Sequence, residues 1–177
     1  MDALILRPNL DPFNFIDKWR DPVWKRCGVY LWSIEHRGAY LASYAGQCFK
    51  GSSNFEVRIW QEFKWWKAGQ DWPVDIEQWK HGVRVELPKP PPPGHTAREI
   101  AELSPLIRLW LMPLATQGEC DQAERWLVAE LCKHPVTRQF LANRNAERYR
   151  PDTAWPVRID APPSFRVFGL TVPVPTA

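Results

Sequence analysis

Two tyrosines and an arginine in the first third of the chain have the residue types and the spacing of a phosphate-handling site. Tyr30 closes the tripeptide GVY at 28–30, and Tyr44, fourteen positions later, opens the tripeptide YAG at 44–46. If the two tripeptides lie on paired strands, both phenols face one site with the Arg58 guanidinium beside them. A guanidinium donates to two phosphate oxygens at once and keeps its proton in proteins. The stretch therefore predicts a site that handles phosphate.

The segments around these residues predict a strand, a turn, a strand and a helix. Residues 27–34 are β-branched and aromatic, as in a buried strand. A polar turn with glycine follows at 36–38 and a second strand at 39–47, and the short connection makes the pair antiparallel. A helix is predicted over 55–69, because its apolar residues recur at helical spacing. These residues are Phe55, Ile59, Phe63 and Trp66.

The second half of the chain supplies one more strand and a second long helix. Residues 106–113 predict a third strand, which follows a short helix at 96–104. Residues 119–135 predict an amphipathic helix that ends at Pro135, and residues 136–147 predict a further helix or turn. We therefore expect an α/β fold, in which helices flank a small, mainly antiparallel three-stranded sheet.

Composition divides the chain into an arm, a main domain and a tail. Residues 1–26 form an N-terminal arm, 27–146 the main domain and 147–177 a proline-rich extension. A Trp/Pro-rich insertion at 70–95 interrupts the main domain, and its alternating residues 83–87 predict a short edge strand. Its run of four prolines cannot continue a helix or a central strand. We interpret the run as a stiff connector. The alternative is a docking site for a protein partner with a proline-recognition domain.

Composition also excludes several classes of protein. The chain of 177 residues is 45% hydrophobic, with a net charge of +3 and a pI near 8.7, which permits nucleic-acid binding without arguing for it. Its four cysteines include no C-x-x-C pair, so we expect no structural zinc site. No stretch reaches the ~20 apolar residues of a membrane span, and the N-terminus is not a secretory signal. We expect a cytoplasmic protein with no membrane partner.

The ordered motifs resemble the signature of the GIY-YIG nuclease superfamily. GVY at 28–30 and YAG at 44–46 match its two tripeptides, with conservative changes at the middle positions. Arg58 lies in the next helix, as the family's arginine does. The resemblance covers about residues 27–146 and is interrupted by the insertion.

Two later positions complete the resemblance. Glu124, with Leu127 and Val128 after it, is similar to the family's E-x-x-[LI]-[IV] pattern, in which the glutamate holds a metal ion. The family's closing asparagine corresponds to Asn143 or Asn145. We favour Asn143, because an apolar pair precedes it in the sequence.

The resemblance implies a metal-dependent endonuclease that hydrolyses phosphodiester bonds in DNA. Tyr30 would accept a proton from water, and Tyr44 would orient water or phosphate. Arg58 would bind phosphate, Glu124 would hold one Mg²⁺ or Mn²⁺ ion, and Asn143 would brace the network. We expect the tyrosines, Arg58 and Glu124 to line one concave surface. The alternative is a non-catalytic nucleic-acid-binding or protein-interaction domain on the same scaffold.

A tyrosine base needs help from its surroundings, because the free pKa of tyrosine is near ~10 and nearby cations are needed to favour the phenolate. Leu31 and Trp32 follow Tyr30 where the family has a basic or histidine partner. We expect His36, Lys50 or a residue of the insertion to take the place of that partner.

Tryptophans and cations are interleaved through the predicted helix and the insertion. They form either a stacking surface for single-stranded nucleic acid or a second small core under the insertion. The tryptophans are Trp60, Trp65, Trp66, Trp72 and Trp79, and the cations are Lys64, Lys67, Lys80 and Arg84. The candidate nucleic-acid contacts are Gly46, Lys50, Lys64 and Lys67.

Overall fold

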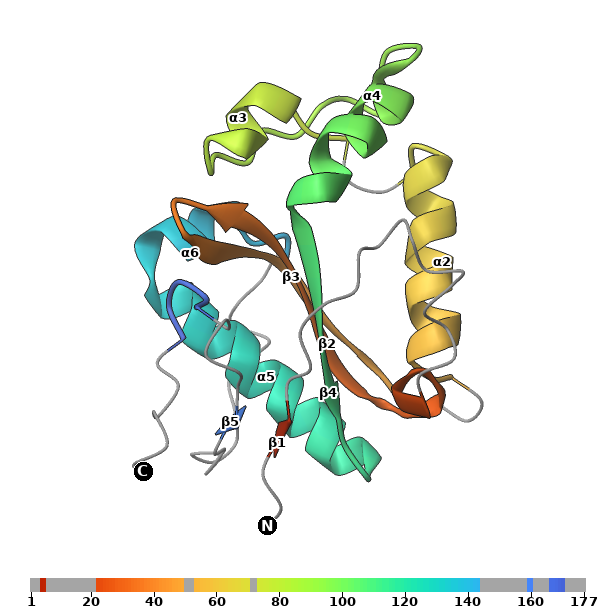
Figure 1. Cartoon of the computed structure of the whole chain (residues 1–177), viewed down its shortest axis with the longest axis vertical. Helices are drawn as coiled ribbons and strands as arrows, with labels where there is room; N and C mark the ends of the chain where they lie inside the picture. Colours follow the sequence, from red (N-terminus) through yellow and green to blue (C-terminus); the bar gives the residue numbers. More distant parts are fainter. Residues whose placement is uncertain are drawn as a thin grey trace.

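A three-stranded antiparallel sheet occupies the centre of the molecule (Figure 1). The computed structural model describes residues 4–5, 22–49, 53–70, 73–143, 159–160 and 166–170. Strands β2 (Gly28–His36), β3 (Ala39–Cys48) and β4 (Ile107–Pro113) follow the order β3-β2-β4, so β2 is central and β3 lies at an edge. Helices flank the sheet, which confirms the expected α/β class with a three-stranded antiparallel sheet.

A two-residue turn joins β2 to β3. Its central residues, Arg37 and Gly38, have φ angles of 51° and 76°. Positive φ at both central positions is the type I′ geometry, whose twist matches the twist of the two strands. This turn sets the register of the first four pairs, from His36 with Ala39 to Ser33 with Ala42, and a bulge beyond them places Tyr30 opposite Gly46.

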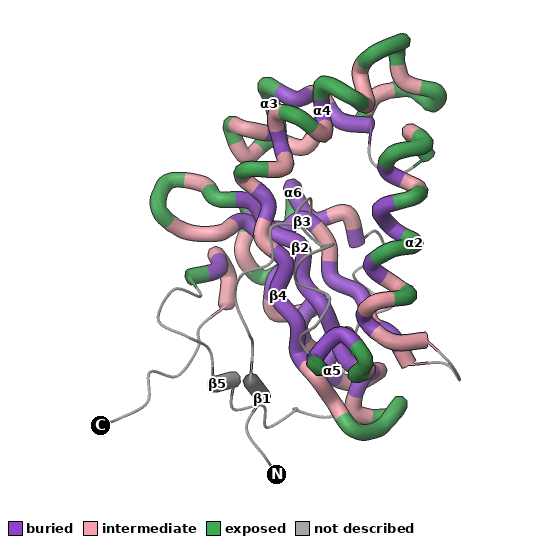
Figure 2. Tube along the Cα trace, turned by 45° about the vertical axis from the view of Figure 1, so that its right-hand side comes forward, coloured by how far each residue is buried: buried purple, intermediate pink, exposed green. Residues whose placement is uncertain are grey.

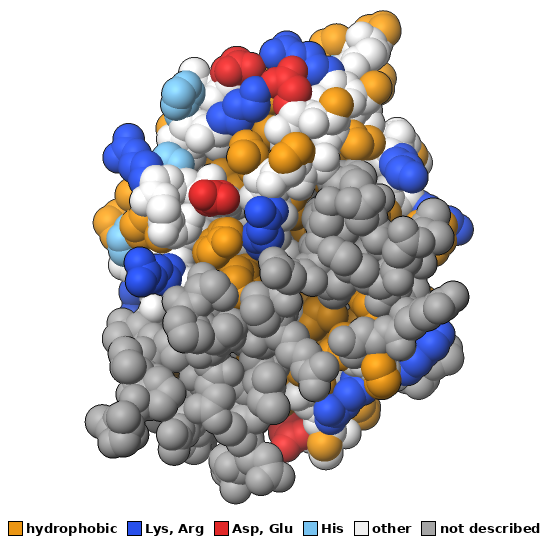
Figure 3. Space-filling model, viewed as in Figure 1, with side chains coloured by type: hydrophobic (Ala, Val, Ile, Leu, Met, Phe, Trp, Pro, Cys, Tyr) orange, Lys and Arg blue, Asp and Glu red, His pale blue; other side chains and the backbone are white. Residues whose placement is uncertain are grey.

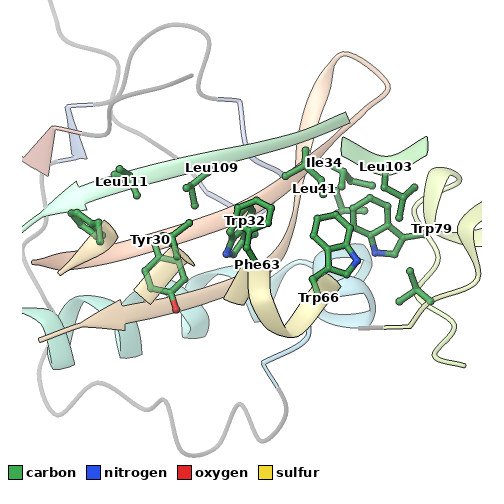
Figure 4. Packing of buried hydrophobic residues seen from close by; sticks show 14 of the residues in the cluster. Tyr30, Trp32, Ile34, Leu41, Phe63, Trp66, Trp79, Leu103, Leu109 and Leu111 are labelled. Atoms are coloured by element: carbon green, nitrogen blue, oxygen red, sulfur yellow. The ribbon is translucent and has the colours of Figure 1, made fainter. Parts of the chain in front are cut away.

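Alternate residues of the strands face two different helices. One face packs against α2 (Phe55–Lys67) and the other against α5 (Gln117–Lys133). The strand residues on the α2 face are Tyr30, Trp32, Ile34, Leu41, Leu109 and Leu111 (Figure 4). Those on the α5 face are Val29, Leu31, Ala42, Ala45, Trp110 and Met112. The sheet is therefore buried on both sides, as the burial colouring of Figure 2 shows.

Both long helices begin at side-chain caps that satisfy free backbone N–H groups. The Asn54 Oδ1 atom accepts from the Val57 N–H at 3.0 Å at the start of α2. Thr116 and Glu119 form a reciprocal capping box at the start of α5. These local signals explain why both helices begin within two residues of their predicted starts.

A β-bulge interrupts β3 and changes which residues face α2. Trp32 pairs with Tyr44 but the next residue, Ser33, pairs with Ala42, so Ser43 is the additional residue. Side chains alternate along a strand, and one additional residue reverses the alternation beyond it. Leu41 therefore faces α2 before the bulge, and Tyr44 faces α2 after it.

The outer edge of β3 is covered by segments from the end of the chain. The Tyr40 N–H donates to the Arg166 carbonyl at 2.6 Å, and the Tyr40 carbonyl accepts from the Phe168 N–H at 2.9 Å. The Ser43 carbonyl accepts from the Ala142 N–H at 2.7 Å. An uncovered edge strand invites pairing with other chains, and these contacts occupy it.

The segment between α2 and β4 belongs to the main core. It contains α3 (Ile76–Lys80), α4 (His95–Leu103) and the 3₁₀ turn η2 (Ser104–Leu106), which lie beyond one end of the sheet in Figure 1. Trp79 packs against Phe140 of α6 (Pro135–Phe140), with 5.3 Å between ring centroids. Val74, Ile76, Trp79 and Trp66 join the same hydrophobic cluster as Tyr30. These residues therefore do not form a second, separate core under the insertion.

Some expected elements of the segment differ in extent. The short helix expected at 96–104 is α4, and the third strand expected at 106–113 is β4. Residues 83–87 form no strand: Glu86 makes one isolated bridge with Val74. Trp72 lies outside the described residues.

The described ends of the chain add a two-stranded parallel pair that the sequence did not predict. β1 (Leu4–Ile5) pairs with β5 (Ile159–Asp160). The 3₁₀ turn η1 (Pro22–Lys25) then leads into β2 and buries Trp24 completely. The rest of the expected arm at 1–26 and of the expected extension at 147–177 lies outside the described residues, apart from 166–170. Among the described helices, none has the length and apolar character needed to cross a membrane.

Replacing Trp79 tests whether the segment at 73–95 is part of the core. Trp79 is 4% exposed, whereas Val83, four positions later, is 48% exposed. Trp79→Ala should lower the free energy of unfolding by about 3–5 kcal/mol, because a buried aromatic leaves a cavity. Val83→Ala should change it by less than about 0.5 kcal/mol. Urea denaturation measures both, and equal midpoints for the two variants would show that the segment is a peripheral decoration.

Candidate active site

Tyr30 of β2 and Arg58 of α2 meet through direct hydrogen bonds. The Arg58 Nε atom donates to the Tyr30 hydroxyl oxygen at 3.0 Å, and the Tyr30 hydroxyl donates to Glu62 Oε1 at 2.5 Å. Arg58 and Glu62 are four positions apart on α2, so they share a helix face, and Arg58 Nη2 lies 3.2 Å from Glu62 Oε1. The three side chains form one closed polar group between the sheet and the helix.

Glu62 is the site residue that sequence reasoning missed. It is 7% exposed, and its second carboxylate oxygen accepts from the Trp32 indole N–H at 2.8 Å. A buried charge needs hydrogen-bonding partners, and the donors from Arg58, Tyr30 and Trp32 provide them. The only sequence signal for this role is the spacing of four between Arg58 and an acidic residue.

The surroundings of Tyr30 favour its protonated form over the phenolate. Burial and the negative charge of Glu62 raise the pKa of Tyr30 well above its ordinary value, and the opposing charge of Arg58 does not reverse this. Tyr30 is 1% exposed. The expected histidine partner is also absent from its side, because His36 lies at the far end of β2, with its ring 6.4 Å from that of Phe168. Lys50 lies outside the described residues.

Tyr44 lies beside this group on the same face of the sheet. Its ring centroid is 6.2 Å from that of Tyr30, and the residue is only partly buried. Burial, then the charge of Glu62, raises the pKa of Tyr44 to about 12, while Arg58 acts in the opposite direction through its charge and a hydrogen bond. Tyr44 is therefore a protonated phenol at neutral pH, and it is the more accessible of the two.

Arg58 is held on several sides. Its guanidinium carbon lies 5.5 Å from the centroid of the Trp65 ring, an arrangement that adds a cation–π contact to the bonds with Tyr30 and Glu62. Burial acts to lower the pKa of Arg58, but Tyr30 and Glu62 raise it above its ordinary value. The side chain is 28% exposed. Arg58 is thus a fixed, permanent positive charge that reaches the surface.

Glu124 forms a second polar group on the other side of β3. Gln47 of β3 donates to Glu124 Oε2 at 3.0 Å and to Asp121 Oδ1 at 2.7 Å, both on α5. Burial, with the nearby negative charge of Asp121, raises the pKa of Glu124 to about 7, against the effects of Gln47 and Arg58. Asp121 is a second carboxylate that the sequence reasoning did not include.

The candidate residues lie on both sides of the edge strand β3, so they do not share one face of the sheet. Tyr30 and Tyr44 face α2, whereas Gln47 and Glu124 lie on the α5 side. The two groups nonetheless influence each other electrostatically: the charge of Glu124 raises the pKa of Tyr44, and the charge of Arg58 lowers the pKa of Glu124. The edge strand therefore lies between the two halves of the candidate site.

Asn143 fixes the edge strand between the two candidate halves. Its Oδ1 atom accepts from the Ala45 N–H, and its Nδ2 atom donates to the Ala45 carbonyl, both at 2.8 Å. Asn143 is buried, so these two bonds satisfy backbone groups that no neighbouring strand reaches. Asn143 thus holds the backbone of β3 at Ala45, and its role in bracing a catalytic network stays a prediction. Asn145 lies outside the described residues.

Gly46 provides space for the Tyr30 phenol. A Cβ atom at Gly46 would lie 2.6 Å from Tyr30 Cζ and closer still to the hydroxyl oxygen. The absence of a side chain at Gly46 thus lets the Tyr30 ring extend across the edge strand. Contact of Gly46 with nucleic acid stays a prediction.

Lys64 and Lys67 are exposed on α2. Lys64 Nζ lies 6.0 Å from the ring centroid of the exposed Trp60. On the face shown in Figure 3, the Lys and Arg side chains stand in several separate places. Their contact with nucleic acid stays a prediction, as does the stacking surface.

The acidic pair on α5 is small for a metal centre. In the part of the chain that the structure describes, no group of three or more His, Cys, Asp and Glu residues could hold a metal ion. Two carboxylates of the kind that Mg²⁺ prefers do share one amide donor, Gln47, and their mutual repulsion helps to raise the pKa of Glu124. The donor set thus fits a single hard cation that keeps several of its water ligands.

Enlarging Gly46 tests the close approach of Tyr30. Gly46→Ala should lower the free energy of unfolding by about 1–3 kcal/mol, because the new methyl group overlaps the phenol and forces it to move. Gly118→Ala is the matched control, since nothing lies within 4 Å of the added Cβ atom in α5. It should be neutral or stabilising by up to about 1 kcal/mol. Thermal unfolding of both variants measures these changes in stability. A melting temperature of Gly46→Ala equal to that of the wild type would refute the packing argument.

The raised pKa of Glu124 predicts a pH-dependent stability difference. A glutamate in the unfolded chain titrates near ~4.3. Between that pH and about 7, Glu124 is therefore protonated in the folded chain and ionised in the unfolded one. The free energy of unfolding consequently falls as the pH rises through this window. Glu124→Gln stays neutral throughout. In EDTA, its melting temperature should exceed that of the wild type at pH 8 and match it near pH 4. Glu130→Gln, on the same helix, is the control, and an identical pH dependence of both variants would contradict the assignment.

No protein-family model, no curated protein and no solved structure matches the chain.

Proposed function

We propose that this protein is a metal-dependent endonuclease of the GIY-YIG type that hydrolyses phosphodiester bonds in DNA. The observation that supports the proposal is the convergence of Tyr30, Tyr44, Arg58 and Glu124 around one edge strand. These residues are nearly a hundred positions apart in the sequence. Hydrolysis of a phosphodiester needs an activated water and charge neutralisation at the phosphoryl oxygens, and a permanent cation, an accessible phenol and a carboxylate that can hold a metal ion suit these tasks.

Arg58 is the residue for the scissile phosphate. Its Nε atom bonds Tyr30, one Nη atom lies beside Glu62, and a hydrogen bond links the guanidinium to Tyr44, while the side chain as a whole stays partly exposed. N–H groups held in place before substrate binds stabilise the charge that develops on phosphoryl oxygens without reorganisation. The Trp65 ring supports one face of the guanidinium.

The two tyrosines have different roles. Tyr44 is only partly buried, and its pKa responds to the charges of both Arg58 and Glu124, so we assign it to orienting water or a phosphate oxygen. Tyr30 is buried, protonated and bonded to Arg58 and Glu62. These contacts favour Tyr30 as a support for Arg58 over its role as a phenolate base.

Glu124, with Asp121 beside it, is the candidate ligand of one Mg²⁺ or Mn²⁺ ion. The ion would supply charge neutralisation at the phosphoryl oxygens when bound. Gln47 holds both carboxylates against β3, which fixes their position relative to Tyr44. A cytoplasmic location accompanies this proposal, and the four free cysteines suit a reducing compartment.

A non-catalytic nucleic-acid-binding domain on the same scaffold is the second candidate. The observation that favours it is the Glu62 carboxylate, which compensates the charge of Arg58 and keeps Tyr30 protonated. In that case Arg58 binds phosphate and no bond is cleaved.

Plasmid nicking separates the two candidates. Wild-type protein should nick supercoiled DNA in Mg²⁺ or Mn²⁺ and not in EDTA. Glu124→Gln should reduce the nicking rate by about 100-fold or more. Loss of a residue that only supports a metal ligand already reduces activity, and loss of the ligand itself should reduce it further. DNA binding, measured by fluorescence anisotropy in EDTA, should persist.

Glu130→Gln is the matched control for this experiment, because Glu130 pairs with Lys133 on the same helix. It should nick at the wild-type rate. DNA binding without metal-dependent nicking by the wild type would favour the non-catalytic candidate. Loss of nicking in Glu130→Gln, with full activity in Glu124→Gln, would refute the assignment of the metal ligand.

A further inference from the structure

Glu62 is the most completely bonded charged side chain of the candidate site. Its two carboxylate oxygens accept from Tyr30, Trp32 and Arg58, which lie on two different elements. It is nearly inaccessible, so it cannot touch a DNA strand at the surface. Whatever Glu62 does in this site, it does through its neighbours.

We propose that Glu62 is a positioning residue that fixes the Arg58 guanidinium for the scissile phosphate. The inference rests on the proposed function for its effect on cleavage. Glu62 forms an ion pair with Nη2 at 3.2 Å, and Tyr30, which donates to Glu62, accepts from Nε. A planar guanidinium held at two nitrogens has one orientation, and its remaining N–H groups then point in one direction.

The charges in this arrangement predict an unusual combination of effects. A carboxylate beside Arg58 weakens the attraction of the guanidinium for phosphate, because part of its charge is already compensated. It also holds the guanidinium in the orientation that the transition state needs. Removal of the carboxylate charge should therefore strengthen DNA binding and slow cleavage. A residue with only a structural role would weaken both or change neither.

The variant must remove the charge without leaving a clash. In Glu62→Gln, an amide NH₂ group replaces one carboxylate oxygen. This donor group would then face a donor of Trp32, Tyr30 or Arg58, from which it cannot accept. Trp32→Phe removes the indole N–H, so that the amide oxygen can still accept from Tyr30 and Arg58. The test pair is therefore the double variant W32F/E62Q, with the single variant W32F as its matched control.

The first measurement does not depend on cleavage. The Arg58 Nε–H should exchange slowly with water in the wild type and in W32F, because it donates to the buried Tyr30. In W32F/E62Q it should exchange at least ~10-fold faster, as seen by nitrogen-15 NMR of the arginine side chains. Equal exchange in W32F and W32F/E62Q would overturn the proposal.

The second measurement uses a DNA oligonucleotide that contains the sequence at which the wild type nicks the plasmid. Relative to W32F, the double variant should bind it several-fold more tightly in EDTA and cleave it ~10–100-fold more slowly at saturating DNA in Mg²⁺. With Arg58→Lys already present, the additional Glu62→Gln change should have little further effect, since the two act as a unit. Unchanged cleavage with a lowered melting temperature would show that Glu62 is structural only.

The two proposals fail in different ways. If the wild type does not cleave, the proposed nuclease activity fails, and the exchange rate of the Arg58 Nε–H still decides whether Glu62 positions Arg58. If the wild type cleaves but W32F and W32F/E62Q behave alike in Arg58 exchange, DNA binding and cleavage, the nuclease proposal stands and the positioning role of Glu62 is refuted.

Discussion

The extra residue in β3 is the constraint on which the candidate site depends. Side chains of a strand point alternately to its two faces, so Leu41 on the α2 face would place Tyr44 on the α5 face of a regular strand. The bulge at Ser43 reverses the alternation and brings Tyr44 to the side of Tyr30. Ser43 is held there by its hydroxyl, which donates to the Trp32 carbonyl at 3.1 Å, and by the bond from Ala142.

The same strand is accessible to groups from both faces because it lies at the edge of the sheet. Tyr30 extends across it over Gly46, while Gln47 holds Glu124 from the opposite side. In a central strand, neighbouring strands would separate these groups. Asn143 satisfies the outward backbone groups of Ala45, so the edge stays ordered without a further strand. The geometry of the site is thus a consequence of the position of β3 in the sheet.

The buried carboxylate of Glu62 shows how polar groups are tolerated inside this core. Burying a charge is costly, and Arg58 with two neutral donors offsets that cost. The hydrogen bonds from Tyr30 and Trp32 to Glu62 join β2 to α2 in one orientation, which hydrophobic contacts between Phe63 and Trp32 would not do by themselves. The segment at 73–95 closes the end of the same core through Trp79 and Ile76, so it stabilises the site without contributing to it.

The sequence by itself determined the elements and their order. The hairpin, the capped helices α2 and α5 and the third strand follow from local signals: polar turn residues, caps and the periodicity of apolar residues. The choice of Tyr30, Tyr44, Arg58 and Glu124 also came from their order along these elements. Such signals depend on a few neighbouring residues, which is why they can be recognised in one sequence.

Only the tertiary structure decided how these residues face one another. The bulge at Ser43 and the entry of Trp79 into the main core depend on contacts between segments far apart in the chain. The raised pKa of Tyr30 depends on its burial and on the charge of Glu62, which is 32 positions away and carries no motif. A pKa is set by burial and by nearby charges in space, and neither can be obtained from the spacing of residues along a sequence.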